Sequence, residues 1–563
     1  MPLRSRDKHF RLPKISLLDF KSLEMDRVLT GLFARIHHKG EDSRLYKKDT
    51  TIETFEEHFL KNPERFKDFN KYPGITRGWL ETHLLDLVNR GKAGKEAVAS
   101  PRPLHGYTYR FRNPRHCRDY GAAQHLYETL WHARNDLGKR AIARLRSFFF
   151  EGIDPNTQQE DLRATVDVET QALLSLNASE EVTQDAPVRG SRDTTPPLCI
   201  GSADILADDI VRLLQYRNKI PRSVMVEYLK ILLAFHLALY HLRLFKLLPE
   251  LVKRKGVEPM CQTTHCPARP GADEKPQGDC SYQIGLFVDV QNQPGTHISH
   301  LAEISAELHY RRIPKFVRAY FLTKKLDEFS QHLLQFGRLP GGTNRQMSVS
   351  DVLRLLDDSH TVDREQYFGS RLLSLKEDMA GEDDTLDPEI QATLGLGLDQ
   401  LNTYIECLMA LRGDFQRSFI VKAVDSLLLK NRAGALLAQA RSSRAPRRFI
   451  LDSRLLEVLL QLAVLHYDTG SGVYYSEEIQ IDRLLAFLRE RYGIYIDALP
   501  RGEGFGEPSI ADREALRRNK AAFKNKLREI GFFQDLSDAY VTQHVTPRYR
   551  IGKETNASAG GVV

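Results

Sequence analysis

The sequence predicts a mainly α-helical protein of several domains, the last of which mixes helices with short strands. Three observations support this fold class. The chain has 563 residues, enough for two to four domains with hydrophobic cores. Apolar residues recur at helical spacing through most of the region 201–440. After residue 441 the pattern becomes a helix, a strand, a second helix, a long basic helix and a hairpin.

Composition places the chain among globular proteins, with 41% hydrophobic and 28% charged residues. A net charge of +7 over this length is dilute, so any argument for nucleic-acid binding depends on local clustering. Six scattered cysteines fit a reducing compartment, and no apolar signal segment follows the basic start, so we expect a cytoplasmic protein. Charged residues and histidines interrupt the most apolar window, 226–245, which predicts a buried core helix and no membrane span.

Residues 1–156 are expected to form an N-terminal helical domain. Helical spacing of apolar residues predicts a helix over 75–91, ended by Gly91. Tyr107, Tyr109 and Phe111 then alternate with polar residues, which is typical of a strand. Two interpretations remain open for 75–112: a degenerate winged helix, or an ordinary helix beside an edge strand.

A polar, proline-containing linker over 157–200 leads to a central helical domain, 201–440. Ser348 and Asp351 form a capping box, so one helix start is well defined. The apolar run 284–290 predicts a strand. The predicted helices of this domain are 203–217, 222–253, 299–310, 314–337, 348–358, 389–412 and 414–441.

The long basic helix near the C-terminus is bounded by local signals. Ser509 and Asp512 form a second capping box, and Gly531 supplies the left-handed residue after the last turn. Seven Lys or Arg and three acidic residues lie between Ala511 and Ile530. At 100° per residue, five of the basic residues share one stripe beside an apolar face. These five are Arg513, Arg517, Lys520, Lys524 and Arg528.

The stretch "NKAAFKNKLREIGFFQDLSDAYVTQHVTPRYRI" resembles the recognition helix and wing of the winged-helix family, and the resemblance covers about residues 449–551. We assign this domain to 441–551 and a flexible tail to 552–563. The resemblance implies contact with double-stranded DNA through the basic stripe, while His544, Arg548 and Arg550 reach the backbone from the hairpin. Asn519 and Asn525 are polar groups beside the stripe. Winged helices also dock proteins, and many basic helices are simply solvated.

No nucleotide-binding, metalloprotease or nucleophile motif occurs in the chain, and no cofactor is predicted. Cys261, Cys266 and Cys280 resemble an incomplete zinc knuckle without a well-placed fourth ligand, so we expect loop cysteines without metal. Asp289 ends the predicted strand, where a metal-dependent nuclease often carries a carboxylate. Its only nearby acidic partners are Glu303 and Glu307 on the following helix. A surface aspartate is the simpler interpretation.

The whole chain is similar to the large helical subunits of bacterial methylation-associated anti-phage defence systems. The stretch "RLPKISLLDFKSLEMDRVLTGLFARI" and the C-terminal domain carry this resemblance. It implies an auxiliary, non-enzymatic DNA-binding subunit of a restriction-like system, acting with a methyltransferase and an ATPase or nuclease encoded nearby. The alternatives are a helical scaffold whose winged helix docks a partner protein, and a metal-dependent nuclease that uses Asp289.

Overall fold

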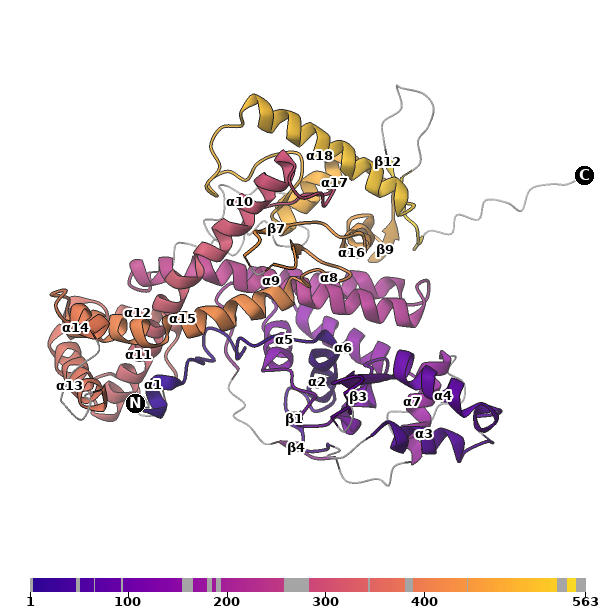
Figure 1. The fold of residues 1–563 in the computed structure, drawn as a ribbon, viewed down its shortest axis with the longest axis horizontal. Coiled ribbons are helices and arrows are strands. Elements are labelled where there is room, and N and C mark those ends of the chain that lie inside the picture. The colour runs from indigo at the N-terminus through magenta and orange to yellow at the C-terminus, as the bar shows by residue number, and fades with distance from the viewer. Residues whose placement is uncertain are drawn as a thin grey trace, which may run out of the picture.

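The computed structural model describes residues 4–46, 51–64, 66–92, 95–153, 166–179, 185–188, 194–257, 283–342, 345–379, 388–442, 444–533 and 544–552. Helices dominate these residues, which confirms the mainly α fold class. Two long helices, α8 (Ile200–Leu213) and α9 (Arg222–Lys253), cross the middle of the molecule (Figure 1). The N-terminal elements lie on one side of this pair and the C-terminal elements on the other, with α11 to α15 at one end (Figure 1).

The N-terminal region consists of short helices, of which α5 and α6 pack on α2 and α1 lies apart against α11. Its helices are α1 (Ser5–Lys8), α2 (Met25–His37), α3 (Ile52–Leu60), η1 (Phe69–Lys71), α4 (Pro73–Trp79), η2 (Leu80–Leu84), η3 (Gly106–Phe111), α5 (Ala122–Trp131), α6 (Leu137–Phe149) and α7 (Val168–Ser179). Its antiparallel strand pairs are β1 (Asp42–Ser43) with β4 (Pro187–Val188) and β2 (Leu85–Val88) with β3 (Ala97–Pro101).

The central region consists of long helices. Besides α8 and α9 it contains η4 (Leu214–Tyr216), α10 (His297–Arg311), α11 (Ile313–Gln335), α12 (Val349–Arg354), η5 (Asp358–His360), α13 (Thr361–Met379), α14 (Pro388–Leu394) and α15 (Gln400–Leu427). The antiparallel hairpin of β6 (Leu437–Gln439) and β7 (Arg447–Phe449) follows α15.

The C-terminal region adds the remaining elements. Its helices are α16 (Ser453–Ala463), α17 (Ile481–Phe487), η6 (Leu488–Tyr492) and α18 (Ile510–Glu529). Its strand pairs are β8 (Leu465–Asp468) with β9 (Val473–Ser476), β10 (Ile479–Gln480) with β12 (His544–Val545), and β11 (Ile494–Tyr495), which is parallel to β5 (Leu286–Phe287).

Buried apolar side chains from Phe10 to Val545 form one connected core. The first residues of the chain contribute to it far from the N-terminal helices, because they extend along α11 (Figure 1). The ring of Phe10 stacks on that of Tyr320 with centroids 4.2 Å apart. Asp7 pairs with Lys325 at 2.9 Å, and both side chains are 2% exposed. The segment that contains Asp7 and Phe10, which we call the strap, therefore fixes the N-terminal region against the central helices.

A buried charge network joins α8, α9 and η6. Arg491 lies 2.7 Å from Asp208 and 2.5 Å from Asp209, and Tyr492 donates to Asp209 at 2.8 Å. His236 Nε2 lies 2.9 Å from the same carboxylate. Burial alone would raise the pKa of Asp209, but Arg491 and His236 lower it to about 2. The network thus holds charged groups that are largely shielded from water, with Asp209 fully buried.

Helix 222–253 was predicted with the bounds of α9, and the capping box at Ser348 and Asp351 is present. Other predicted elements were wrong. The predicted helix 75–91 changes to strand β2 at Leu85, because β3 offers a partner for pairing. The helices predicted at 389–412 and 414–441 are replaced by α14 and α15, and α15 runs through Gly413 and ends at Leu427.

The aromatic alternation near residue 107 does not form the predicted strand. Gly106–Phe111 is the 3₁₀ helix η3, in which Tyr107, Thr108 and Tyr109 are all buried. A period of two indicates a strand only where one face meets solvent, and this segment packs on both sides. The guanidinium of Arg110 instead covers the Tyr107 ring, 4.2 Å from its centroid. A degenerate winged helix near 75–112 therefore lacks its predicted basic strand.

Candidate nucleic-acid interface

Helix α18 begins and ends where the local signals predicted. The hydroxyl of Ser509 accepts from the Asp512 amide at 3.2 Å, and the Asp512 carboxylate accepts from the Ser509 amide at 2.9 Å. Gly531 ends the helix with a φ of +76°. One face of α18 is buried, and its buried residues are Ala515, Leu516, Asn519, Phe523 and Leu527.

Two polar side chains anchor α18 to the strand ends below it. Asn519 is fully buried, donates to the carbonyl oxygens of Val288 and Ile496 at 2.8 and 2.9 Å, and accepts from the Val290 amide at 3.0 Å. Lys526 donates to the carbonyls of Val290 and Leu451 at 3.2 and 2.5 Å. Asn519 was expected to lie free beside the basic stripe, and this was wrong.

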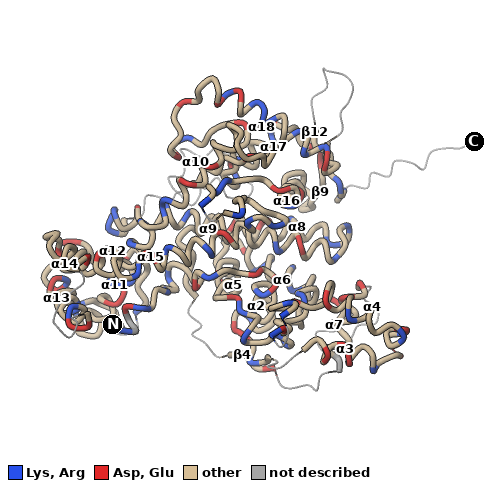
Figure 2. The backbone as a smooth tube through the Cα atoms, viewed as in Figure 1, with Lys and Arg blue, Asp and Glu red and all other residues tan. Residues whose placement is uncertain are grey.

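The five residues of the basic stripe differ in exposure. Arg513, Arg517 and Arg528 are exposed, whereas Lys520 and Lys524 are half-buried. In Figure 2, Lys and Arg positions recur along the tube of α18, which lies at the edge of the molecule. The stripe is therefore present as a surface feature, and its three arginines are its most accessible members.

Acidic neighbours reduce the effective charge of part of the stripe. Lys520 pairs with Asp482 of α17 at 2.7 Å and lies 3.8 Å from Asp497. Hydrogen bonding to Lys520 lowers the pKa of Asp482, with a smaller effect from Lys524. Arg517 is 83% exposed and lies 3.7 Å from Glu514. An anion meeting this face would contact the arginines before the paired lysine.

The segment after α18 returns beside α17. Strand β12 (His544–Val545) pairs antiparallel with β10, and Phe533 bridges Val545. His544 is half-buried, while Arg548 and Arg550 are exposed. The predicted turn at residues 537–539 lies outside the described residues.

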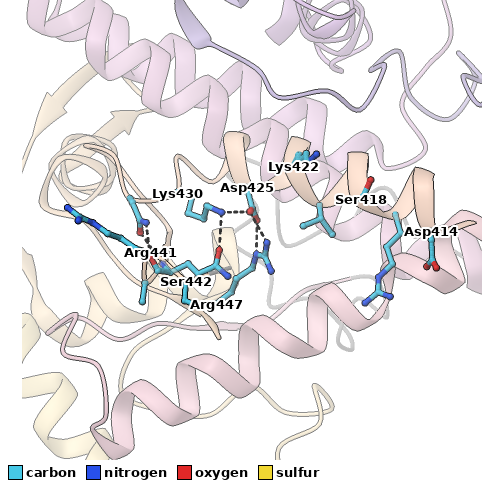
Figure 3. Close-up of a pocket in the computed structure, with 13 residues that line it drawn as sticks. Asp414, Ser418, Lys422, Asp425, Lys430, Arg441, Ser442 and Arg447 are labelled. Atoms are coloured by element: carbon cyan, nitrogen blue, oxygen red, sulfur yellow. Dashed lines mark hydrogen bonds and ion pairs between the residues drawn. The ribbon is translucent and has the colours of Figure 1, made fainter. Parts of the chain in front are cut away.

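A second cation-rich surface lies between the C-terminal half of α15 and the β6–β7 hairpin. It is a groove of about 700 Å³ (Figure 3). Local sequence patterns did not predict this groove, because its basic residues come from segments separated along the chain. The groove is lined by Asp414, Arg417, Ser418, Val421, Lys422, Asp425, Lys430, Asn431, Gln439, Ala440, Arg441, Ser442 and Arg447.

Asp425 organises the base of this groove. Arg447 donates to both of its oxygens at 2.9 Å, and Lys430 donates at 2.6 Å (Figure 3). Tyr310 of α10 also donates to this carboxylate, at 2.7 Å. Burial would raise the pKa of Asp425, but Arg447, Lys430 and Tyr310 lower it, so the carboxylate stays ionised. Lys430 also donates to the Gln439 side chain at 3.0 Å. These contacts hold the hairpin against α15.

Asp289 does not lie at an open cleft. Its carboxylate is fully buried, accepts from the Asn292 amide at 3.0 Å and lies 3.8 Å from the Arg448 Nε. Burial raises the pKa of Asp289. Glu303 and Glu307 form no group of close metal ligands with it among the residues described. This geometry does not favour the nuclease alternative.

Among the described residues, His37, His38 and Asp185 place three potential metal ligands within 4.8 Å of one another. The carboxylate already accepts from Ser43 at 2.7 Å and from Tyr109, while His38 Nε2 lies 3.1 Å from it. We interpret the cluster as a hydrogen-bonded link between β4 and the end of α2. Cys261, Cys266 and Cys280 lie outside the described residues.

In the described part of the chain, α9 is a helix long and apolar enough to cross a membrane. However, 94% of its most apolar window is buried inside the protein. Its composition is therefore explained by core packing, as predicted for 226–245.

Fold and surface define a large, mainly helical protein with two separate cation-rich surfaces. The family model described as methylation-associated defense system protein MAD7 matches residues 5–549, and the chain belongs to this family. The predicted membership of a methylation-associated defence system is thereby confirmed. No curated protein and no solved structure matches the chain.

Proposed function

We propose that this defence-system component contacts double-stranded DNA through α18, and that residues 449–551 form a winged-helix domain. The observation that carries the proposal is the combination of a rigidly anchored helix with an outward row of arginines. Anchoring matters because a helix that is fixed in place presents its charges without an ordering cost on binding.

The order and pairing of elements support the winged-helix assignment. α16, α17 and α18 follow one another, as the three helices of such a domain do. β10 precedes α17 and pairs with β12, while Phe533 joins from the other side of Val545. A small antiparallel sheet of this kind is where a wing would start.

The charges support contact with phosphates more than reading of bases. Arg513, Arg517 and Arg528 are exposed on one face of α18, and arginine binds phosphate with fork geometry. Arg548 and Arg550 follow β12 and add a second group of exposed cations. Asn519 lies beside the stripe, but its amide group donates to two backbone carbonyls within the chain and is not available to a base.

In this proposal the chain has no catalytic role of its own and acts in the cytoplasm with other subunits of its operon, such as a methyltransferase or an ATPase. Family membership supports the presence of other system components. The DNA-binding role of this subunit is our inference from α18.

The test is a charge reversal of Arg513, Arg517 and Arg528 to Glu in the full chain. Affinity for duplex DNA should fall at every salt concentration, and the slope of log K against log salt should decrease by about 2.7, or about 0.9 per phosphate contact. Fluorescence anisotropy with a labelled duplex of about 30 base pairs measures both quantities over a salt series.

The matched control reverses Lys61, Arg90 and Lys139, which are 73, 60 and 68% exposed in the N-terminal region. It changes net charge equally but should leave the slope unchanged. Unchanged affinity and slope in the α18 variant would reject DNA contact by this helix. Co-purification with an operon neighbour that is lost in the same variant would then support a protein-docking scaffold.

A further inference from the structure

The groove between α15 and the β6–β7 hairpin is lined by more basic than acidic side chains. Arg417, Lys422 and Arg441 line it and are exposed, and they form no ion pair within the described part of the chain. The opposing carboxylates are Asp414, which is exposed, and Asp425, which Lys430 and Arg447 already neutralise. Three cations therefore face the open groove against one acid.

The base of the groove is rigid because its polar groups bond to one another. Asn431 donates to the Gln439 carbonyl at 2.7 Å, and Gln439 donates to the Ala445 carbonyl at 2.8 Å. Tyr310 of α10 closes the network from below, with the Arg447 guanidinium 4.9 Å from its ring centroid. These bonds fix Gln439 and Ala445, which lie on either side of the segment that carries Arg441.

The lining indicates what kind of anion would fit. Val421 and Ala440 are its apolar side chains, and it contains no aromatic residue. A free nucleotide site is mostly apolar and usually stacks the base, so this groove lacks that part of a nucleotide pocket. Cations without a stacking platform instead suit the sugar–phosphate backbone of a nucleic acid, which carries charge at regular intervals.

The groove and α18 belong to one rigid frame. β7 lines the groove through Arg447 and leads directly to Leu451, whose carbonyl accepts from Lys526 of α18. α10 also contacts both β7 and α18. A nucleic acid held at one surface would therefore keep a defined orientation relative to the other.

We propose that the groove bounded by Arg417, Lys422 and Arg441 binds the phosphate backbone of the same DNA that contacts α18. The inference rests on the proposed function for the identity of the polyanion, but it uses different residues. The two contacts together would extend the protein footprint beyond one helix.

The experiment reverses Arg417 and Arg441 to Glu in the full chain and repeats the salt series with the duplex of about 30 base pairs. Affinity should fall about tenfold near physiological salt, and the slope should decrease by about 1.8, the loss of two phosphate contacts. The double variant Arg417→Gln/Arg441→Gln should also lower the affinity and the salt slope, by a smaller amount. Both side chains are exposed, so thermal unfolding should match that of the unaltered protein.

The control for net charge reverses Lys61 and Lys139 and should leave both quantities unchanged. Unchanged binding in the groove variant, with loss in the α18 variant, would overturn this inference and leave the proposed function standing. Loss in the groove variant alone would instead reject α18 as the DNA contact and retain the groove. Displacement of the duplex from the groove by millimolar ATP, or by polyglutamate as readily as by competitor DNA, would also overturn it, because the ligand would then be a free nucleotide or an acidic protein.

Discussion

Arg491 and Arg517 lie 26 residues apart, yet the fold uses them in opposite ways. Arg491 is enclosed with Asp208 and Asp209 between three helices, and its side chain is 13% exposed. Arg517 is 83% exposed on α18, and its ion pair with Glu514 is long, at 3.7 Å, and open to solvent. The first is bound to partners within the chain, and the second is free to bind a partner outside it.

This contrast shows why charge in a sequence does not by itself identify a binding surface. A buried pair is costly to break because one charge is left without water or partner. An exposed cation contributes little to stability. Its side chain is also accessible, so it can bind a ligand. We therefore expect substitutions in the buried network of Arg491 to lower stability, and substitutions in the exposed stripe of α18 to lower DNA affinity.

The largest effect is expected for Arg491→Ala. It leaves Asp208 and Asp209 buried without their cation, so the free energy of unfolding should fall by about 3–5 kcal/mol. Urea denaturation followed by circular dichroism measures this loss. Arg517→Ala, the exposed counterpart, should change it by less than about 0.5 kcal/mol. Equal free energies of unfolding for the two variants would show that the buried network does not stabilise the fold.

Buried histidines should make the protein less stable in mild acid. Burial lowers the pKa of His241 and His309 to about 4. The unfolded chain takes up protons near pH 6.5 and the folded chain does not, so stability is full above about pH 6.5 and is lost as pH falls toward 4. Between pH 7 and 5 the pair should contribute a loss of about 4 kcal/mol.

The surroundings of His241 explain why its ring stays neutral in the folded protein. His241 Nδ1 lies 2.7 Å from the Leu237 carbonyl and its Nε2 lies 3.0 Å from the Ser16 hydroxyl, so the neutral ring is satisfied on both sides. His309→Gln should flatten the pH dependence of the unfolding free energy between pH 7 and 5. A pH profile identical to that of the unaltered chain would contradict the assignment.

Asn519→Ala should cost about 2 kcal/mol, because three hydrogen bonds to strand backbones are lost. Asn525→Ala, on the exposed side of the same helix, should be close to neutral. Denaturant midpoints of the two variants make the comparison. A drop in DNA affinity at constant stability for Asn519→Ala would instead indicate that this amide contacts the DNA.

The smallest effect separates two members of the stripe. Arg517→Ala should decrease the salt slope of DNA binding by about 0.9, whereas Lys520→Ala should decrease it by about half as much. The reason is that Lys520 already pairs with Asp482 and must leave it to reach a phosphate. Anisotropy titrations at several salt concentrations resolve the difference. Equal slopes would show that the pair opens without cost.

Local signals were sufficient for several elements and insufficient for others. The capping boxes before α12 and α18 were predictable because the groups involved lie within one turn of helix. The change from helix to strand at Leu85 was not, since it depends on pairing with β3. Likewise the alternation at Tyr107 and Tyr109 gave no sign that both faces of that segment would be buried.

For the candidate sites the division is similar. The stripe on α18 could be read from spacing alone, because a regular helix converts spacing into a face. The groove could not, since Arg417 and Arg441 meet only after the β6–β7 hairpin packs against α15. The strap formed by Phe10 and Asp7 was also invisible, because its partners lie some 300 residues away.

The sequence by itself determined the helical class, the starts of the helices with capping boxes and which residues carry charge. The tertiary structure decided which of those charges are neutralised within the chain and which face solvent. Asp209 and Tyr492 are 283 positions apart and Asn519 and Val288 are 231 apart, and no local pattern records such pairings. Their energies depend on burial and on geometry across the core, which exist only once the chain has folded.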